Sequence, residues 1–457
     1  MYNVVLMVID CLRADHVSSY GYPRQTTPNI DALSRKGLLL KNAYTQSTFT
    51  LASAATLLTG LYPETHNVLT FNDRLPEGFP TLPRVLQQHG YATACFPGMG
   101  FFSPPWGLDD VGFQNVVRTD EGAEEKRKGT CERIRESFIN YIDDVKKPFF
   151  SLLWFFDLHA SFDGIPIPTG EKYRDDESSR GRIDRYDSAL AHVDRNIGVI
   201  LEALEERGLL DETLIIVTSD HGDLFDEHQL LEGSRFEGLL SKVPGLGRKL
   251  GDKDYLGHLG VIPYDEVIHI PLIMKLPRGE SGCAYEGNVG LIDLFPTIMG
   301  RLDSGGEEYP VQGRDILSTG EGDSEGGRVV FCSTKPFDWN ALMTCARDDE
   351  FKLVKVFPPR VTLSNLKSKP RKLLVDHLLG GDRLYRCAVD EMNDVSAEHP
   401  EQKQRLLLLL EEWRKENVRF REESLVRFEF KAAVETEYTE EEKEIFKERL
   451  KALGYLE

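Results

Sequence analysis

Residues 3 to 10 read Asn3-Val4-Val5-Leu6-Met7-Val8-Ile9-Asp10, an apolar run that ends in an acid. A run without alternating polar residues is typical of a strand buried on both faces, as in the middle of a parallel sheet. Two more runs, Phe149 to Phe156 and Leu214 to Ser219, have the same form. The acids and histidines that follow these two runs are Asp157, His159, Asp220 and His221.

The carboxyl ends of parallel strands form one edge of a sheet, where ligands usually bind, so these residues are expected to converge. Taken singly, Asp10 or Asp220 could be the N-cap of a following helix, and His159 could be a hydrogen-bonded loop histidine. Together, carboxylates and imidazole suit a divalent cation. Mn, Mg, Ca and Zn all remain open, because this donor set does not select among them.

Apolar runs alternate with amphipathic stretches through residues 1–320, which predicts an α/β domain with a doubly wound, mostly parallel sheet flanked by helices. A helix is expected over 186–207, ending at Gly208, with a strand at Thr213–Thr218 directly after it. The segments Phe236–Tyr255 and Val361–Lys372 look inserted, and each could be a lid or a plain surface loop.

The glycine-rich segment 317–327 is the candidate boundary to a smaller α+β subdomain, residues 328–457. Strands of an antiparallel sheet are expected at Val329–Ser333 and Phe351–Phe357. Helices are expected at Glu401–Glu416 and at about Glu440–Leu453, the second on the surface.

The chain has 457 residues and a net charge of −20, which disfavours nucleic acids and anionic lipid surfaces as partners. A small anionic substrate is still compatible, because a bound cation dominates the potential inside a site. The apolar start is too short for a membrane span or signal peptide, and the seven scattered cysteines suggest reduced thiols. A cytoplasmic location is therefore expected, and the oligomeric state is left open.

Thr50 begins a run of helix-forming residues that Gly60 ends. This order places the Thr50 hydroxyl at a helix N-terminus, where free amide groups favour anions. The plain reading is an N-cap threonine. Beside a cation, the same hydroxyl could instead act as a nucleophile.

Several motifs resemble the sulfatase family of the alkaline-phosphatase superfamily, in order and in spacing. They are Asp10-Cys11-Leu12-Arg13-Ala14-Asp15-His16, Leu57-Leu58-Thr59-Gly60, Thr218-Ser219-Asp220-His221-Gly222, Tyr264-Asp265-Glu266 and Ile292-Asp293-Leu294-Phe295-Pro296. With the closing Leu453-Gly454-Tyr455-Leu456, the resemblance covers nearly the whole chain.

The resemblance implies one divalent metal held by Asp10, Asp220, His221 and the nucleophile Thr50. It also implies that His159 binds substrate, and that His258 lies where relatives carry a Lys or His that contacts the transferred group or the leaving oxygen. The expected partner is a small anionic ester.

The departures from the family pattern are specific. Thr50 replaces the Cys or Ser that becomes formylglycine, so no formylglycine is expected, and Cys11 replaces a second metal-binding Asp. Gly98-Met99-Gly100 replaces a stretch that supplies cations to the substrate. With fewer cations, a monoanionic ester is favoured over a phosphate dianion, because uncompensated charge in a partly desolvated pocket is costly.

An ester on Thr50 must be cleaved by water, which requires a second-step base or another metal. His159, His258 and Asp157 are the candidates, all three are expected to contact the substrate, and together they could hold a second cation. The leading hypothesis is a hydrolase of a sulfate, phosphodiester or phosphonate monoester, attacked by Thr50. The alternatives are a phosphodiesterase or a group transferase of the same superfamily, and a catalytically inactive binding protein.

Overall fold

The computed structural model describes residues 1–70, 73–76, 78–102, 107–108, 110–118, 130–146, 148–159, 181–225, 227, 262–279, 282–302, 309–318, 327–335, 341–358, 380–387, 391 and 393–427. Several expected features lie outside these residues. They are the helix at 440–453, both inserted segments, most of the glycine-rich segment, and His258.

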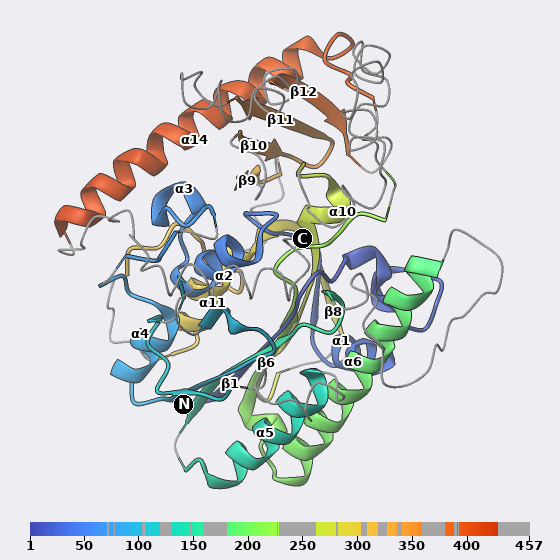
Figure 1. Ribbon diagram of the computed structural model, residues 1–457, viewed down its shortest axis with the longest axis vertical. Helices are drawn as coiled ribbons and strands as arrows, with labels where there is room; N and C mark the ends of the chain where they lie inside the picture. Colours follow the sequence, from blue (N-terminus) through green and yellow to red (C-terminus); the bar gives the residue numbers. More distant parts are fainter. Residues whose placement is uncertain are drawn as a thin grey trace, which may run out of the picture.

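An eight-stranded sheet forms the centre of the molecule (Figure 1). Its strand order is β4-β3-β5-β1-β6-β7-β2-β8. The strands are β1 (Asn3–Ile9), β2 (Leu38–Tyr44), β3 (Ala92–Pro97), β4 (Asn115–Val116), β5 (Phe149–Phe155), β6 (Thr213–Thr218), β7 (His269–Lys275) and β8 (Cys283–Gly290). All neighbouring strands pair in parallel except β7, which is antiparallel to both β6 and β2.

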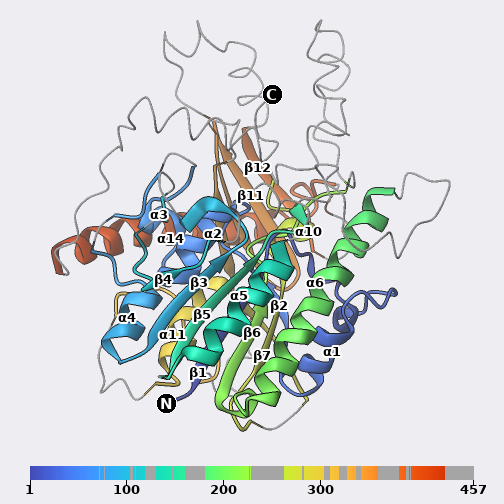
Figure 2. The ribbon, with the colours of Figure 1, turned by 60° about the horizontal axis from the view of Figure 1, so that its bottom comes forward.

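Helices cover both faces of this sheet because the side chains of each strand point alternately to opposite faces (Figure 2). Val4, Leu6 and Val8 of β1 pack in a core with α2 (Thr50–Thr59), α4 (Leu82–Gln88) and α11 (Leu294–Met299). Val5 and Met7 pack in a second core with α1 (Pro28–Arg35), α5 (Thr130–Asp144) and α6 (Gly181–Glu206). The prediction of a doubly wound, mostly parallel α/β sheet is confirmed.

A separate four-stranded antiparallel sheet follows, in the order β12-β11-β10-β9. Its strands are β9 (Val330–Thr334), β10 (Leu342–Arg347), β11 (Phe351–Phe357) and β12 (Gly381–Arg386), and α14 (Pro400–Arg427) lies across it (Figure 1). Leu406 and Trp413 of α14 share a core with Leu353 of β11, and also with Tyr62 and Ile292 of the first domain. The C-terminal α+β subdomain is confirmed, and the boundary between residues 320 and 328 stays a prediction.

The predicted elements differ from the structure mainly at their ends. Thr213–Thr218 and Phe351–Phe357 are strands as predicted, and α6 begins at Gly181 instead of residue 186. The prediction that the next helix ends at Glu416 is wrong, because α14 continues to Arg427. Its apolar residues thin out after Trp413, while Arg419 forms ion pairs with Glu416 and Glu423.

None of the helices in the described ranges is long and apolar enough to cross a membrane.

Candidate active site

Asp10, Thr50, Asp220 and His221 meet at the carboxyl edge of the sheet. The reason is the strand order, because β1 lies between β5 and β6 and runs parallel to both. Asp10 and Asp220 therefore follow adjacent strand ends, and both side chains are fully buried. Thr50 reaches them as the first residue of α2, where the sequence placed it.

Three groups hold the carboxylate of Asp10. Trp154 Nε1 donates to its Oδ2 at 3.2 Å, and the Cys11 thiol donates to its Oδ1 at 3.1 Å. The Thr50 hydroxyl lies 3.5 Å from Oδ2. The backbone of Asp10 is also fixed, since its N–H donates to Phe155 O at 2.9 Å.

The Asp220 carboxylate is only half satisfied. Its Oδ1 accepts the backbone N–H of Cys11 at 3.2 Å. Its Oδ2 is buried and accepts no hydrogen bond from the part of the chain that the structure describes, although His221 Nε2 lies 3.4 Å away. A buried carboxylate oxygen in this position is expected to have a cationic partner.

The imidazole of His221 faces Thr50. Its Nδ1 donates to Gly222 O at 2.7 Å, because a carbonyl can only accept. In the neutral ring the lone pair is then on Nε2, which lies 3.1 Å from Thr50 Oγ1. A backbone carbonyl on one ring nitrogen is the usual way in which a metal-binding histidine is oriented.

The electrostatics of the site also favour a cation. Burial, and then the neighbouring Asp220 carboxylate, raise the pKa of Asp10 to about 7, although His221 lowers it. Burial opposes charge on His221, but Asp220 and Asp10 outweigh it and raise the pKa of this imidazole. Two carboxylates, a hydroxyl and an imidazole thus lie together, with His221 Nε2 3.4 Å from Asp220 Oδ2 and 3.1 Å from the Thr50 hydroxyl. These residues fit a divalent metal.

Cys11 is the unusual member of this group. Its φ is +60°, in the left-handed region that residues other than glycine rarely adopt. This conformation lets its N–H reach Asp220 while its thiol reaches Asp10. Its Sγ and one potential metal-ligand atom each of Asp10 and His221 all lie within 4.8 Å of one another.

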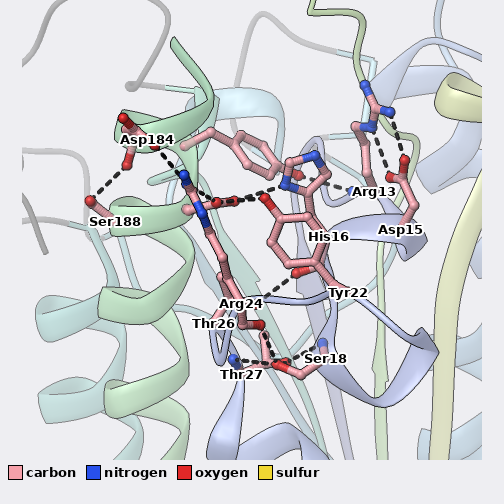
Figure 3. A network of polar contacts seen from close by, with 12 residues as sticks. Arg13, Asp15, His16, Ser18, Tyr22, Arg24, Thr26, Thr27, Asp184 and Ser188 are labelled. Carbon is pink, nitrogen blue, oxygen red and sulfur yellow. Dashed lines mark hydrogen bonds and ion pairs between the residues drawn. The ribbon is translucent and has the colours of Figure 1, made fainter. Parts of the chain in front are cut away.

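The loop after Cys11 is anchored to the start of α6 by a polar network (Figure 3). Arg13 binds Asp15 through two nitrogens, at 2.9 and 2.7 Å. His16 Nδ1 lies 2.8 Å from Asp187 Oδ1, and Arg24 Nη1 binds Asp187 Oδ2 at 2.7 Å. The network fixes the segment that carries the Cys11 amide, so it supports the geometry at Asp220.

The other predicted site residues have different surroundings. Both oxygens of Asp157 bind the start of α5, one accepting the Cys131 N–H at 3.3 Å and the other the Thr130 hydroxyl. His159 is buried and stacks on Phe156, with ring centroids 4.2 Å apart. His258 lies outside the described residues. The second cation suggested for these three residues stays a prediction.

A network from the C-terminal sheet supports His221, and it could not be predicted from the sequence. The Gly222 N–H donates to Val267 O at 2.7 Å, in α10 (Asp265–Ile268). Asp265 at the start of α10 binds Arg347 at 3.0 Å and Lys352 at 2.9 Å. The turn next to His221 therefore rests on α10, which two cations of the second sheet hold in place.

Comparison with known proteins decides the family. The family model described as Sulfatase matches residues 2–304, well over half of the chain. The chain belongs to the sulfatase family. The resemblance found in the sequence is thereby confirmed, and the class of enzyme that it indicates is a sulfatase-like ester hydrolase.

Two curated relatives and one solved structure illustrate the range of proteins that this chain is similar to. An arylsulfatase of Clostridium perfringens is 22% identical, over 65% of this chain and 74% of its own length. The low-salt glycan biosynthesis sulfotransferase Agl7 of Haloferax volcanii is 25% identical, over 69% of this chain and 64% of its own. The phosphonate monoester hydrolase of Agrobacterium radiobacter superposes with a TM-score of 0.67 at 19% identity, over 91% and 96% of the two chains. This last likeness concerns the fold alone.

Proposed function

We propose that this sulfatase is a metal-dependent hydrolase of a sulfate ester, or of a related monoanionic phosphate or phosphonate ester, with Thr50 as the nucleophile. The observation that carries the proposal is the position of the Thr50 hydroxyl. It lies 3.1 Å from His221 Nε2 and 3.5 Å from Asp10 Oδ2, at the start of a buried helix. No other hydroxyl among the described residues contacts both groups.

Asp10, Thr50, Asp220 and His221 would hold one divalent cation, which is Mn, Ca, Mg or Zn. When bound, it supplies charge that activates the Thr50 hydroxyl and offsets the negative charge of the ester. The chain's own residues prepare this arrangement. Gly222 O fixes the His221 ring, while Trp154 and Cys11 hold the Asp10 carboxylate.

The substrate is positioned by the N-terminus of α2, whose dipole favours an anion next to Thr50. In the second step, a base takes the proton of the water that cleaves the Thr50 ester. His159 and His258 are proposed for this role and for contact with substrate. Asp157 contributes indirectly, because its two oxygens bind the start of α5 and so hold the chain two residues before His159.

The comparisons support an ester of sulfur or of phosphorus without choosing between them. The Clostridium relative is named an arylsulfatase, and the Agrobacterium structure is named a phosphonate monoester hydrolase. A singly charged ester suits both chemistries. It also suits a site with one cation and few other positive groups.

The test is turnover of nitrophenyl sulfate, phosphate, phosphodiester and phosphonate esters with each of the four metals. Thr50→Ala should lower kcat/KM by at least about a thousandfold, the scale for loss of a nucleophile. Thr50→Ser should retain activity because it keeps the hydroxyl. The matched control is Thr59→Ala in the same helix, which loses only local bonds, to Ala55 O and from the Leu61 N–H. Equal turnover by Thr50→Ala and wild type would refute the proposal.

A transferase is the second candidate, and the name of the Haloferax relative favours it. The same threonine ester would then pass its group to an alcohol instead of water. Product analysis with added acceptor alcohols separates the two, since a transferase yields the acceptor ester in preference to free sulfate. The third candidate is a catalytically inactive binding protein. Metal analysis tests it, because a protein that cannot be loaded with metal would support this candidate.

We also propose a cytoplasmic location, supported by seven cysteines that form no disulfide in the structure. Fractionation of the source cells, followed by detection of the chain, tests this location.

A further inference from the structure

Helices α5 and α6 lie side by side on one face of the sheet and run in the same direction (Figure 2). Three polar contacts connect them, at the start, in the middle and at the end of α5. They join Glu132 to His192 at 3.1 Å, Arg135 to Asn196 at 2.8 Å, and Asp143 to Arg207 at 2.7 Å. The second and third are ordinary hydrogen bonds, but the first is not.

His192 Nε2 lies 3.1 Å from Glu132 Oε1, yet it is buried and makes no hydrogen bond with any described residue. The two atoms are close but not aligned for proton sharing. Cys131 Sγ lies beside them, 3.9 Å from Glu132 Oε2. A sulfur, an oxygen and a nitrogen atom of these three residues all lie within 4.8 Å of one another.

This spacing is the one expected of atoms that share an ion. Bonds of about 2.0–2.3 Å to a tetrahedral zinc ion place neighbouring ligand atoms about 3.3–3.6 Å apart. The separations of 3.1 and 3.9 Å lie on either side of that range. Asp220 Oδ2 and His221 Nε2 in the active site show the same pattern, at 3.4 Å and without a hydrogen bond.

The sulfur of Cys131 accepts a hydrogen bond from Asn196. Asn196 Nδ2 donates to Cys131 Sγ at 3.3 Å, while its Oδ1 accepts from Arg135 at 2.8 Å. Because Arg135 can only donate, it sets the orientation of the amide and turns the NH₂ group toward the sulfur. An N–H donor of this kind stabilises a thiolate that binds a metal.

We propose that Cys131, Glu132 and His192 bind one divalent cation of the zinc class, at a site separate from the one at Thr50. A thiolate and a carboxylate would balance its charge, and solvent would complete the coordination, since Glu132 is partly exposed. In the structure the exposed Arg195 donates from Nη2 to His192 Nδ1 at 3.3 Å, so binding of an ion by Nε2 would require Arg195 to move and Nδ1 to take up the ring proton.

The site has a clear place in the fold. The Cys131 N–H donates to Asp157 Oδ1, at the end of β5 and two residues before His159. A bound ion would therefore fix the start of α5 to α6 and steady the loop that carries His159. Burial and the nearby Asp157 raise the pKa of the Cys131 thiol well above its usual range, so binding releases a proton and weakens at low pH.

Cobalt(II) is a suitable probe, because a thiolate ligand gives it a charge-transfer band in the near ultraviolet. The experiment uses the full chain with Cys11→Ser and Asp220→Asn, which remove the thiol and one carboxylate of the active site. We expect this variant to bind one equivalent of cobalt with the thiolate band. Adding Cys131→Ser should abolish the band, and adding His192→Gln should weaken binding at least tenfold. Cys95→Ser, at a buried thiol in β3, is the matched control and should change neither.

Three results would overturn the proposal: no cobalt bound by the starting variant, cobalt bound without the band, or a band that survives Cys131→Ser. Near-ultraviolet circular dichroism checks that each variant is folded. If Cys131→Ser does not fold, the test rests on His192→Gln, and a cobalt affinity unchanged by this substitution would contradict the proposed metal site. Because cobalt binding is read without turnover and with the active site altered, the result is independent of the proposed reaction.

Discussion

The ammonium group of Lys352 lies 2.9 Å from the carboxylate of Asp265, and the lysine side chain is completely buried. Lys352 also binds Glu391 at 2.7 Å, so one lysine of β11 joins two acids from outside its own sheet. Burial opposes its charge, but Asp265 and Glu391 raise the pKa of Lys352 well above its usual value. The ammonium group is thus charged in the folded protein.

Replacing Lys352 with Met should destabilise the protein by about 3–5 kcal/mol, because Glu391 would lose its buried cation while Asp265 would keep only Arg347. Denaturant unfolding measures this loss. The control is Lys355→Met in the same strand, whose partner Glu411 is solvent-exposed, and which should cost less than about 1 kcal/mol. Equal effects of the two substitutions would show that the buried pairs do not hold α10.

Gly222→Ala should impair catalysis more than folding. A Cβ at this position would lie 2.0 Å from Glu266 O, a backbone atom of α10, so the turn beside His221 must move. A shift of about 1 Å at a catalytic group lowers the rate about a hundredfold. Steady-state kinetics of the most active ester measures this. Gly181→Ala, where a Cβ meets nothing within 4 Å, should leave the rate unchanged, and similar losses in both variants would contradict the argument.

The left-handed backbone of Cys11 predicts an unusual order of stabilities. Glycine adopts this conformation freely, whereas a side chain there costs about 1 kcal/mol. Cys11→Gly should therefore be more stable than Cys11→Ala by about 1 kcal/mol, although both lose the thiol. At Cys95, in an ordinary strand, Ala should be the more stable of the two. The same order at both positions would argue against the positive φ of Cys11.

His66 should make stability depend on pH. Burial lowers the pKa of this imidazole to about 3, and its Nε2 lies 3.0 Å from Thr56 Oγ1. Since the folded pKa lies below the usual histidine value of 6.5, its contribution is complete above pH 6.5 and is lost toward pH 3. The loss approaches about 1.4 kcal/mol per pH unit.

Thermal unfolding between pH 7 and pH 4 measures this effect. His66→Gln should flatten the profile relative to wild type, whatever its own stability. His89→Gln, at a partly exposed histidine, should keep the wild-type slope. A slope unaffected by His66→Gln would mean that other groups cause the acid loss.

The convergence of Asp10, Asp220 and His221 could be predicted because it depends on a local pattern. An apolar run followed by an acid fixes both the strand and the position of the acid at its end. The helix that begins at Thr50 is equally local. The reversed direction of β7 could not be read, because His269–Lys275 is as apolar in one direction as in the other.

Contacts between residues far apart in the sequence could not be predicted either. Asp157 looked like an active-site acid because it follows a strand, but its carboxylate binds the start of α5. Cys11 looked like the loss of a metal ligand, and the sequence contains no sign that its thiol would contact Asp10. β11 contains two lysines, Lys352 and Lys355, and nothing in the sequence singled out Lys352 as the centre of the buried ion pairs around Asp265.

Tyr62 and Ile292 of the first domain share a core with Leu406, Leu410 and Trp413 of α14, and this constrains how the two domains can evolve. The family match ends at residue 304, but a protein truncated at that point would expose the apolar side chains of Tyr62 and Ile292. Recombination between relatives is therefore constrained, because an exchanged C-terminal subdomain must pack against the same apolar residues, Tyr62 and Ile292. The two parts of the chain are expected to have descended together.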